Sequence, residues 1–186
     1  PGAPQGPVPV GLSRTGARGG PRPGAGPVGA GLRAVEWAWT GWLVLGMEYA
    51  SINWAATYAL PAIFAQALLF AGAALSGRGL ALQENPSHLA VLMFVFVLIA
   101  YPVSGVVLGR PWQAAEMFGL SPDTLVAATL AVLLASKGWL SRVAWVVPLV
   151  WAALAGLTLW MLGSVEWILL PSFALLCLVW AARSSR

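Results

Sequence analysis

The sequence predicts an all-α integral membrane protein, a bundle of six transmembrane helices with both termini on the cytoplasmic side. Of the 186 residues, 59% are hydrophobic and only 9% are charged, whereas soluble domains carry roughly 25% charged residues. The mean hydropathy of +0.80 agrees with this composition. Because so few charges cannot cover a water-exposed surface, the bilayer is the expected solvent. Arginine and lysine residues separate the apolar stretches, and their positions predict the topology.

Residues 1–30 form a Gly/Pro-rich, low-complexity segment that we predict to be a cytoplasmic arm. Proline removes backbone donors, and glycine raises the entropy cost of ordering the chain. The arm is therefore expected either to stay extended or to become ordered by lying along the cytoplasmic surface of a partner. Its arginines Arg14, Arg18 and Arg22 are the residues expected to contact that partner.

Residues 31–186 form the predicted transmembrane helical domain. A spanning helix needs about 20 predominantly apolar residues. Six stretches meet or approach this length, near residues 33–52, 56–76, 88–108, 122–137, 142–162 and 165–182.

The first two spans follow one another with no basic residue between them. Residues 34–77 contain no Lys or Arg, and these 44 residues have about twice the length of one span. The polar residues Ser51, Asn53 and Thr57 predict a tight turn between the two spans. Trp54 places this turn at the far interface, because indole rings favour that depth.

The fourth span is the shortest, with 16 residues over 122–137. We expect it to cross with little tilt or where the bilayer is thinned. The preceding stretch, residues 110–121, is too polar and too broken by Pro and Gly to span. It is predicted to be an external loop or a short helix that lies in the interface.

The basic residues predict the orientation of the six spans. Lys and Arg are retained on the cytoplasmic side during insertion. With six spans, Arg110 alone falls on the external side, and the other nine fall on the side of the N-terminus: Arg14, Arg18, Arg22, Arg33, Arg78, Lys137, Arg142, Arg183 and Arg186. This distribution indicates a topology signal and not a nucleic-acid-binding surface.

Four polar residues within or beside the spans are the candidates for a functional site: Glu48, Asn53, Gln66 and Glu166. A carboxylate in the bilayer normally faces protein or water, so Glu48 is either a proton or cation site or a partner in an interhelical hydrogen bond. The ordinary role of Gln66 is an interhelical hydrogen bond as well. Asn53 favours a turn, and Glu166 suits the N-terminal end of the last helix.

The sequence indicates neither an enzyme nor a metal site. His88 is the single histidine and is expected at the interfacial start of the third span, and Cys177 has no second cysteine with which to form a disulfide. No P-loop, Rossmann or nucleophile-elbow motif is present. No cofactor is evident, although the deeper indole rings Trp42, Trp151 and Trp160 could contact lipid, quinone or pigment as well as neighbouring helices.

Short motifs in a fixed order resemble an uncharacterised bacterial family of multi-pass membrane proteins, the domain of unknown function DUF6064. The resemblance covers about residues 34–180 and is carried by Ile52–Asn53, Tyr101–Pro102 with Gly105, Phe118–Gly119 with Pro122 and Thr124, Pro148–Leu149 with Trp151, and Glu166. The resemblance implies a membrane helical bundle and no particular activity. In the first matched helix the family often carries a histidine where this chain has Leu45, and a further helix precedes it where this chain has the arm.

The preferred functional hypothesis is an accessory or scaffolding transmembrane subunit of a larger complex, of photosynthetic or respiratory type, in the bacterial inner membrane. Its expected partners are membrane lipids and other transmembrane subunits, and no nucleic acid. The alternative hypothesis is a small-solute or ion transporter or channel that uses Glu48 and Asn53, with Gln66 and Glu166 along the path.

Overall fold

A computed structural model of the chain describes residues 25–52, 54, 56–77, 81–83, 86–109, 111 and 121–184. The predicted all-α class is confirmed over these residues, where two very short strands are the exception to helices and turns. Residues 1–24 of the predicted arm, with Arg14, Arg18 and Arg22, lie outside the described residues, and so does Asn53.

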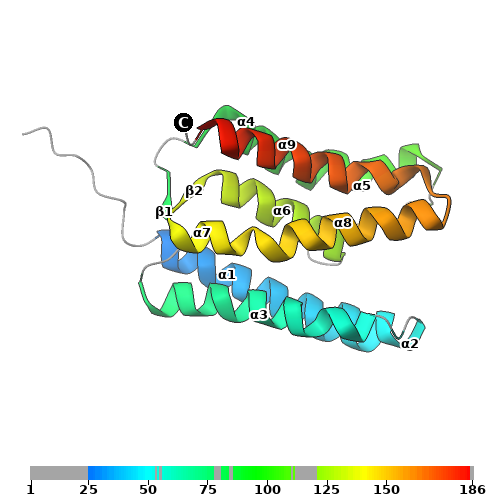
Figure 1. The fold of residues 1–186 in the computed structure, drawn as a ribbon, viewed down its shortest axis with the longest axis horizontal. Coiled ribbons are helices and arrows are strands. Elements are labelled where there is room, and N and C mark those ends of the chain that lie inside the picture. Colours follow the sequence, from blue (N-terminus) through cyan, green and yellow to red (C-terminus); the bar gives the residue numbers. More distant parts are fainter. Residues whose placement is uncertain are drawn as a thin grey trace, which may run out of the picture.

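The described helices join into six consecutive segments that run side by side (Figure 1). The first combines α1 (Ala25–Trp39), η1 (Thr40–Tyr49) and α2 (Ala50–Ile52), and the second is α3 (Ala56–Leu75). The third combines α4 (His88–Val95), η2 (Phe96–Ala100) and α5 (Tyr101–Val107), and the fourth is α6 (Pro122–Leu134). The fifth combines α7 (Trp139–Ala144) and α8 (Val146–Met161), and the sixth combines η4 (Val165–Ile168) and α9 (Leu169–Ser184).

Two predicted boundaries differ from the structure. The first helix begins at Ala25 and not near residue 33, so the last residues of the segment predicted as an arm, 25–30, are helical. The fourth helix ends at Leu134 and not at residue 137, because Ser136 and Lys137 form strand β2 (Ser136–Lys137). A tight turn between the first two spans was predicted and is present, where the hydroxyl of Thr57 donates to the carbonyl of Trp54 at 2.6 Å.

The short helix α6 is the centre of the bundle. Eleven of its 13 residues are buried, and it is in contact with α1, α4, α8 and α9. Its Ala and Thr side chains are small and allow the surrounding helices to approach closely, while its Val and Leu side chains fill the space between them. A helix of this length is about 20 Å long, shorter than the hydrocarbon core of about 30 Å. The surrounding segments cover most of the surface of α6, so little of this short helix is left to contact lipid.

A two-stranded antiparallel sheet lies at the C-terminal end of α6. Strand β1 (Ala81–Leu82) pairs with β2, with Ala81 opposite Lys137 and Leu82 opposite Ser136. Directly after β1, the backbone N–H of Gln83 donates to the carbonyl of Ala135 at 2.8 Å, and its side-chain amide donates to the carbonyl of Leu134 at 3.3 Å. These bonds satisfy carbonyls that a helix C-terminus leaves without partners.

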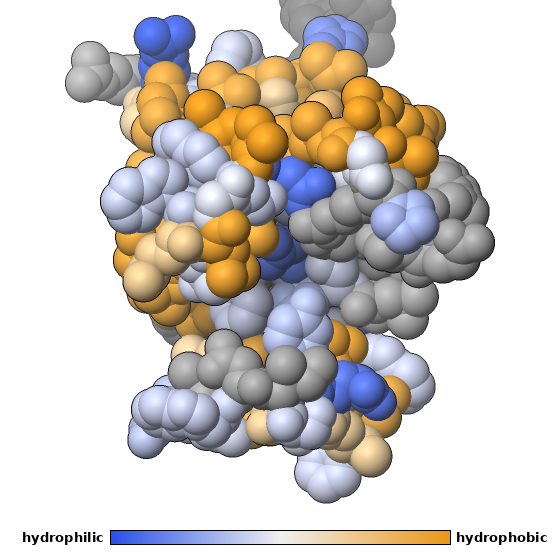
Figure 2. Space-filling model, turned by 90° about the vertical axis from the view of Figure 1, so that its right-hand side faces the viewer, coloured by the Kyte–Doolittle hydropathy of each residue, from blue (hydrophilic) through white to orange (hydrophobic). Residues whose placement is uncertain are grey.

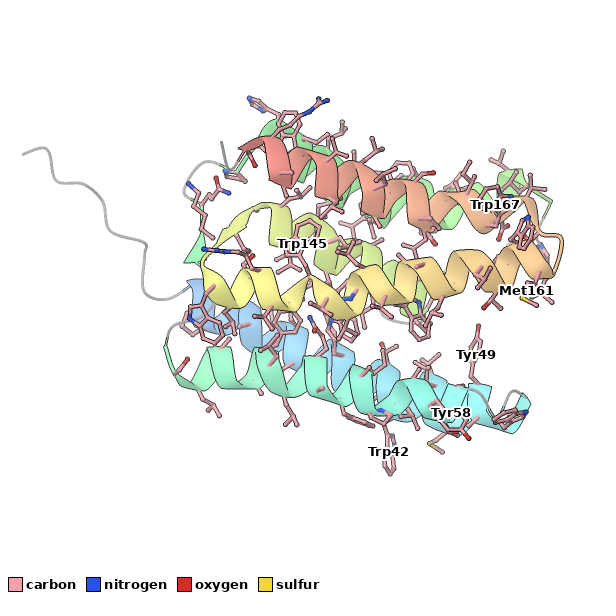
Figure 3. The ribbon with its side chains drawn as sticks, in the orientation of Figure 1. Trp42, Tyr49, Tyr58, Trp145, Met161 and Trp167 are labelled. Carbon is pink, nitrogen blue, oxygen red and sulfur yellow. The ribbon has the colours of Figure 1, made fainter. Side chains whose placement is uncertain are left out.

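The outer surface is predominantly apolar, as a membrane environment requires. Large exposed residues such as Leu75, Val107 and Leu162 lie on it, and Trp42 and Tyr58 point away from the bundle (Figure 3). Within the part of the chain that the structure describes, four helical stretches are long and apolar enough to cross a membrane: Ala56–Leu75, His88–Val107, Trp139–Met161 and Val165–Ser184.

Candidate functional site

Two carboxylates from distant parts of the sequence line one small cavity at the start of α6. Asp123 lies in the first turn of α6, and Glu166 lies in η4 and is buried. The cavity has a volume of about 10 Å³, and its other lining residues are Tyr101, Ser104, Gly105, Leu159 and Leu169. A space of this size holds about one water molecule.

The local sequence fixes the position of Asp123. Ser121 is the N-cap of α6, and its hydroxyl accepts a hydrogen bond from the N–H of Asp123 at 3.3 Å. Pro122 follows at the first helical position, where its missing N–H costs nothing. The Asp123 carboxylate then lies in the first turn of the helix, where the helix dipole favours a negative charge. Its Oδ1 also accepts a hydrogen bond from the indole N–H of Trp151 at 2.8 Å, which ties α6 to α8.

Glu166 is positioned by a similar cap. The hydroxyl of Ser164 accepts a hydrogen bond from the N–H of Glu166 at 3.3 Å, at the start of the 3-10 turn that leads into α9. From the third segment, the hydroxyl of Ser104 donates to the carbonyl of Tyr101 at 2.6 Å. Three segments and α6 therefore meet at this point. The third and sixth segments and α6 contribute polar residues, and the fifth contributes Leu159.

This arrangement can hold a water molecule, a proton or a small cation near two carboxylates within an otherwise apolar bundle. It lies toward the end of the bundle opposite the start of α1 and the end of α9. Figure 2 views that end and shows hydrophilic surface in a recess near its centre, with hydrophobic surface above it. Within the described residues, no group of three or more His, Cys, Asp or Glu side chains is placed to hold a metal ion.

The structure separates the other residues predicted for a polar site. Glu48 lies in η1 with an exposed side chain, one turn before the end of the first segment at Ile52, and it does not line the cavity of Glu166. Its carbonyl accepts a hydrogen bond from the Ser51 hydroxyl at 2.6 Å. His88 is exposed at the first position of α4, so the predicted helix start is present; its place at a membrane interface stays a prediction.

Gln66 is buried and forms an interhelical hydrogen bond. Its side-chain amide donates to the carbonyl of Ala144 at 2.9 Å, across the contact between α3 and the fifth segment. In a continuous helix this carbonyl would accept from residue 148, but that residue is proline and has no N–H. Gln66 therefore supplies the donor that Pro148 lacks, as neighbouring helices do for prolines within membranes.

Two buried polar contacts were not predicted from the sequence. The indole N–H of Trp37 donates to the hydroxyl of Thr129 at 3.1 Å, so this tryptophan packs inside the bundle instead of lying at an interface. Nη1 of Arg33 lies 2.8 Å from Oε2 of Glu36, one turn along α1. The spacing of Arg33 and Glu36 was available in the sequence, but the burial of the pair depends on helices that lie beside α1.

The described residues define an all-α bundle in which four helical stretches are long and apolar enough to cross a membrane. A family model describes the same chain over residues 19–186, that of a family of unknown function, DUF6064. The chain belongs to this family, as the sequence motifs indicated. Neither a curated protein nor a solved structure gives a significant match.

Proposed function

We propose that the chain crosses the bacterial inner membrane six times with both termini in the cytoplasm. The start of α1, the end of α9 and strand β2 lie at the same end of the bundle, as six antiparallel segments require (Figure 1). Lys137, Arg142 and Arg183 belong to this end, and the side that retains basic residues is the cytoplasmic one. The first segment carries Arg33, Glu36 and Glu48 and is less apolar than the four spanning helices, so its place in the membrane rests on its packing against α3.

Within that membrane, we propose that the protein is an accessory or scaffolding subunit of a larger complex. The observation that carries this proposal is the use of polar side chains inside the bundle. Gln66, Trp37 and Trp151 each join one segment to another by a hydrogen bond. The space at the centre is filled by α6. Polar groups that hold helices together are typical of a packing role and differ from a continuous lining along a transport path.

The outer surface offers a place for a partner helix. A groove of about 340 Å³ runs between α8 and α9, and its lining residues are Ala153, Gly156, Leu157, Trp160, Trp167 and Pro171. Gly156 removes bulk from α8 at the base of the groove, while the indole ring of Trp160 remains 61% exposed beside it. Aromatic side chains next to small residues are favourable anchors for an apolar helix.

Purification of the tagged full chain from native membranes in mild detergent tests the subunit proposal. A partner is expected at a fixed ratio with the wild type. Trp160→Ala removes an exposed wall of the groove and should lose the partner, whereas Trp42→Ala removes an equally exposed indole from another segment and should retain it. A chain that purifies alone or only with itself, in all three forms, would contradict the proposal.

The second candidate function is proton- or cation-coupled transport, and the cavity between Asp123 and Glu166 favours it. On this proposal Glu166→Gln would abolish proton- or cation-dependent flux in vesicles. Glu48→Gln should leave it unchanged, because Glu48 lies apart from the cavity. Equal flux in Glu166→Gln and wild-type vesicles would remove this candidate.

A further inference from the structure

A second and much larger cavity lies between α1 and α4. Its volume is about 320 Å³, within the range of about 300–1,000 Å³ that is usual for small-molecule sites. The packing of the segments explains it. α1 packs along α3 and α4 packs on α6, so that α6 forms the floor of a gap between α1 and α4. The floor residues are small and apolar, among them Ala131 and Val132.

The cavity opens sideways onto the apolar outer surface. Leu32 of α1 and Val91 of α4 line it, and these side chains are 61% and 50% exposed. In a membrane this surface faces lipid, so a molecule dissolved in the bilayer can reach the cavity without passing through water. The interior has room for a ligand, since a Cβ atom added to the lining residue Gly29 would meet no atom within 4 Å.

One wall of this apolar cavity is polar. Arg33 and Glu36 line it as a largely buried ion pair, with side chains 10% and 25% exposed. Oε2 of Glu36 lies 2.8 Å from Nη1 of Arg33, so the carboxylate is paired within the wall of the cavity. A carboxylate oxygen has more than one acceptor position, so a hydroxyl group on a ligand can donate to Glu36 in addition to the ion pair. Because the ion pair is neutral overall, it favours an uncharged polar head over an anionic one.

We propose that the cavity binds an uncharged membrane amphiphile, with its hydrocarbon chain between α1 and α4 and a hydroxyl-bearing head at Arg33 and Glu36. A glyceride and a quinol share this chemistry. The proposal is independent of the subunit role, because it concerns a lipid-facing cavity and not the groove between α8 and α9. It requires only that the bundle lie in a membrane.

Glycine substitutions give a matched test. Gly29→Phe places a ring in the cavity, and Gly72→Phe places the same ring on the exposed face of α3, where an added Cβ also meets no atom within 4 Å. Each variant and the wild type would be purified in mild detergent and extracted for mass spectrometry. The amount of a glyceride or quinol per protein should be about tenfold lower in Gly29→Phe than in Gly72→Phe, as expected if the ring lowers the affinity for the ligand about tenfold.

Addition of defined probes separates the two sources of the ligand. Monooleoylglycerol, decylubiquinol and the anionic probe oleate would each be titrated into delipidated protein while the midpoint of thermal unfolding is recorded. The probe of the right class should raise the midpoint of the wild type and of Gly72→Phe but not of Gly29→Phe. Glu36→Leu, with folding checked by gel filtration, should remove the same response. Equal responses in both glycine variants, or a response only to the anionic probe oleate, would overturn the proposal.

Discussion

Gln66 donates the hydrogen bond that Pro148, which has no N–H, cannot donate to the carbonyl of Ala144. Proline at position 148 leaves the carbonyl of Ala144 without its usual donor, and Gln66 donates to that carbonyl from α3. A buried acceptor without a donor costs about 1–3 kcal/mol, and interhelical hydrogen bonds in membranes contribute roughly 0.6 kcal/mol on average. The contribution of Gln66 to the free energy of unfolding therefore depends on the presence of Pro148.

We expect Gln66→Leu to lower the free energy of unfolding by about 1 kcal/mol in detergent, because it keeps the volume and removes the donor. In a Pro148→Ala background the helix can supply its own N–H to Ala144, and the same substitution should cost clearly less. Denaturant unfolding of the four proteins measures the difference. If Gln66→Leu costs as much in the Pro148→Ala background as in the wild type, then the amide does not replace the missing N–H.

At the level of residues, the sequence predicted roles better than partners. The interhelical bond of Gln66, the turn at Ser51 and Thr57, and the position of His88 at a helix start follow from residue type and neighbours. The partnership of Asp123 with Trp151 and the shared cavity with Glu166 could not be predicted. These residues are far apart in the sequence, and their contact depends on how three segments pack around α6.

Among the elements, the crossing of α8 and α9 depends on a single missing side chain. A Cβ atom at Gly156 would clash with the ring of Pro171 and would lie 3.0 Å from the carbonyl oxygen of Trp167. That carbonyl lies four residues before Pro171, which has no N–H to donate to it. Close approach at glycine is a general device for packing helices in membranes.

Gly156→Ala is expected to destabilise the protein by roughly 1–3 kcal/mol, the usual cost of overpacking. Gly72→Ala serves as the control. It should be neutral or slightly stabilising, because its Cβ would meet no atom within 4 Å and alanine favours helix. Thermal unfolding in detergent compares the two. A Gly156→Ala protein as stable as the wild type would show that the two helices can separate at that point without loss.

The number of elements was easier to predict than their internal form. The lengths of the apolar stretches and the basic residues between them predicted six helical segments. Most of the predicted boundaries lie close to the observed helix ends. The π-helical segments η1 and η2 and the β1–β2 pairing were not expected. A wider helical turn or a two-residue strand leaves no composition signal, because it is selected by contacts with other segments. The start of α1 at Ala25 was not predicted, because the glycines and the proline of residues 26–29 disfavour a helix.

For the whole molecule, the proposed orientation makes a clear prediction about accessibility. In a Cys177→Ala background, single cysteines would be introduced as Lys137→Cys and Ser184→Cys at one end and as Leu162→Cys at the other. A membrane-impermeant maleimide should label Leu162→Cys in intact spheroplasts. It should label the other two only in inside-out vesicles, because basic ends remain cytoplasmic. Labelling of Lys137→Cys from the opposite side to Ser184→Cys would exclude an arrangement with six crossings.

The enclosure of α6 has a consequence for biogenesis. The ribosome completes α6 before α8 and α9, yet those two helices cover it in the finished protein. At about 20 Å it is too short to be a good substrate for independent release from the translocon into lipid. We therefore expect a nascent chain halted after Leu162 to leave the region around Asp123 open to protease, and the full-length chain to protect it. Quality control of this protein would then act on the last helix to be synthesised.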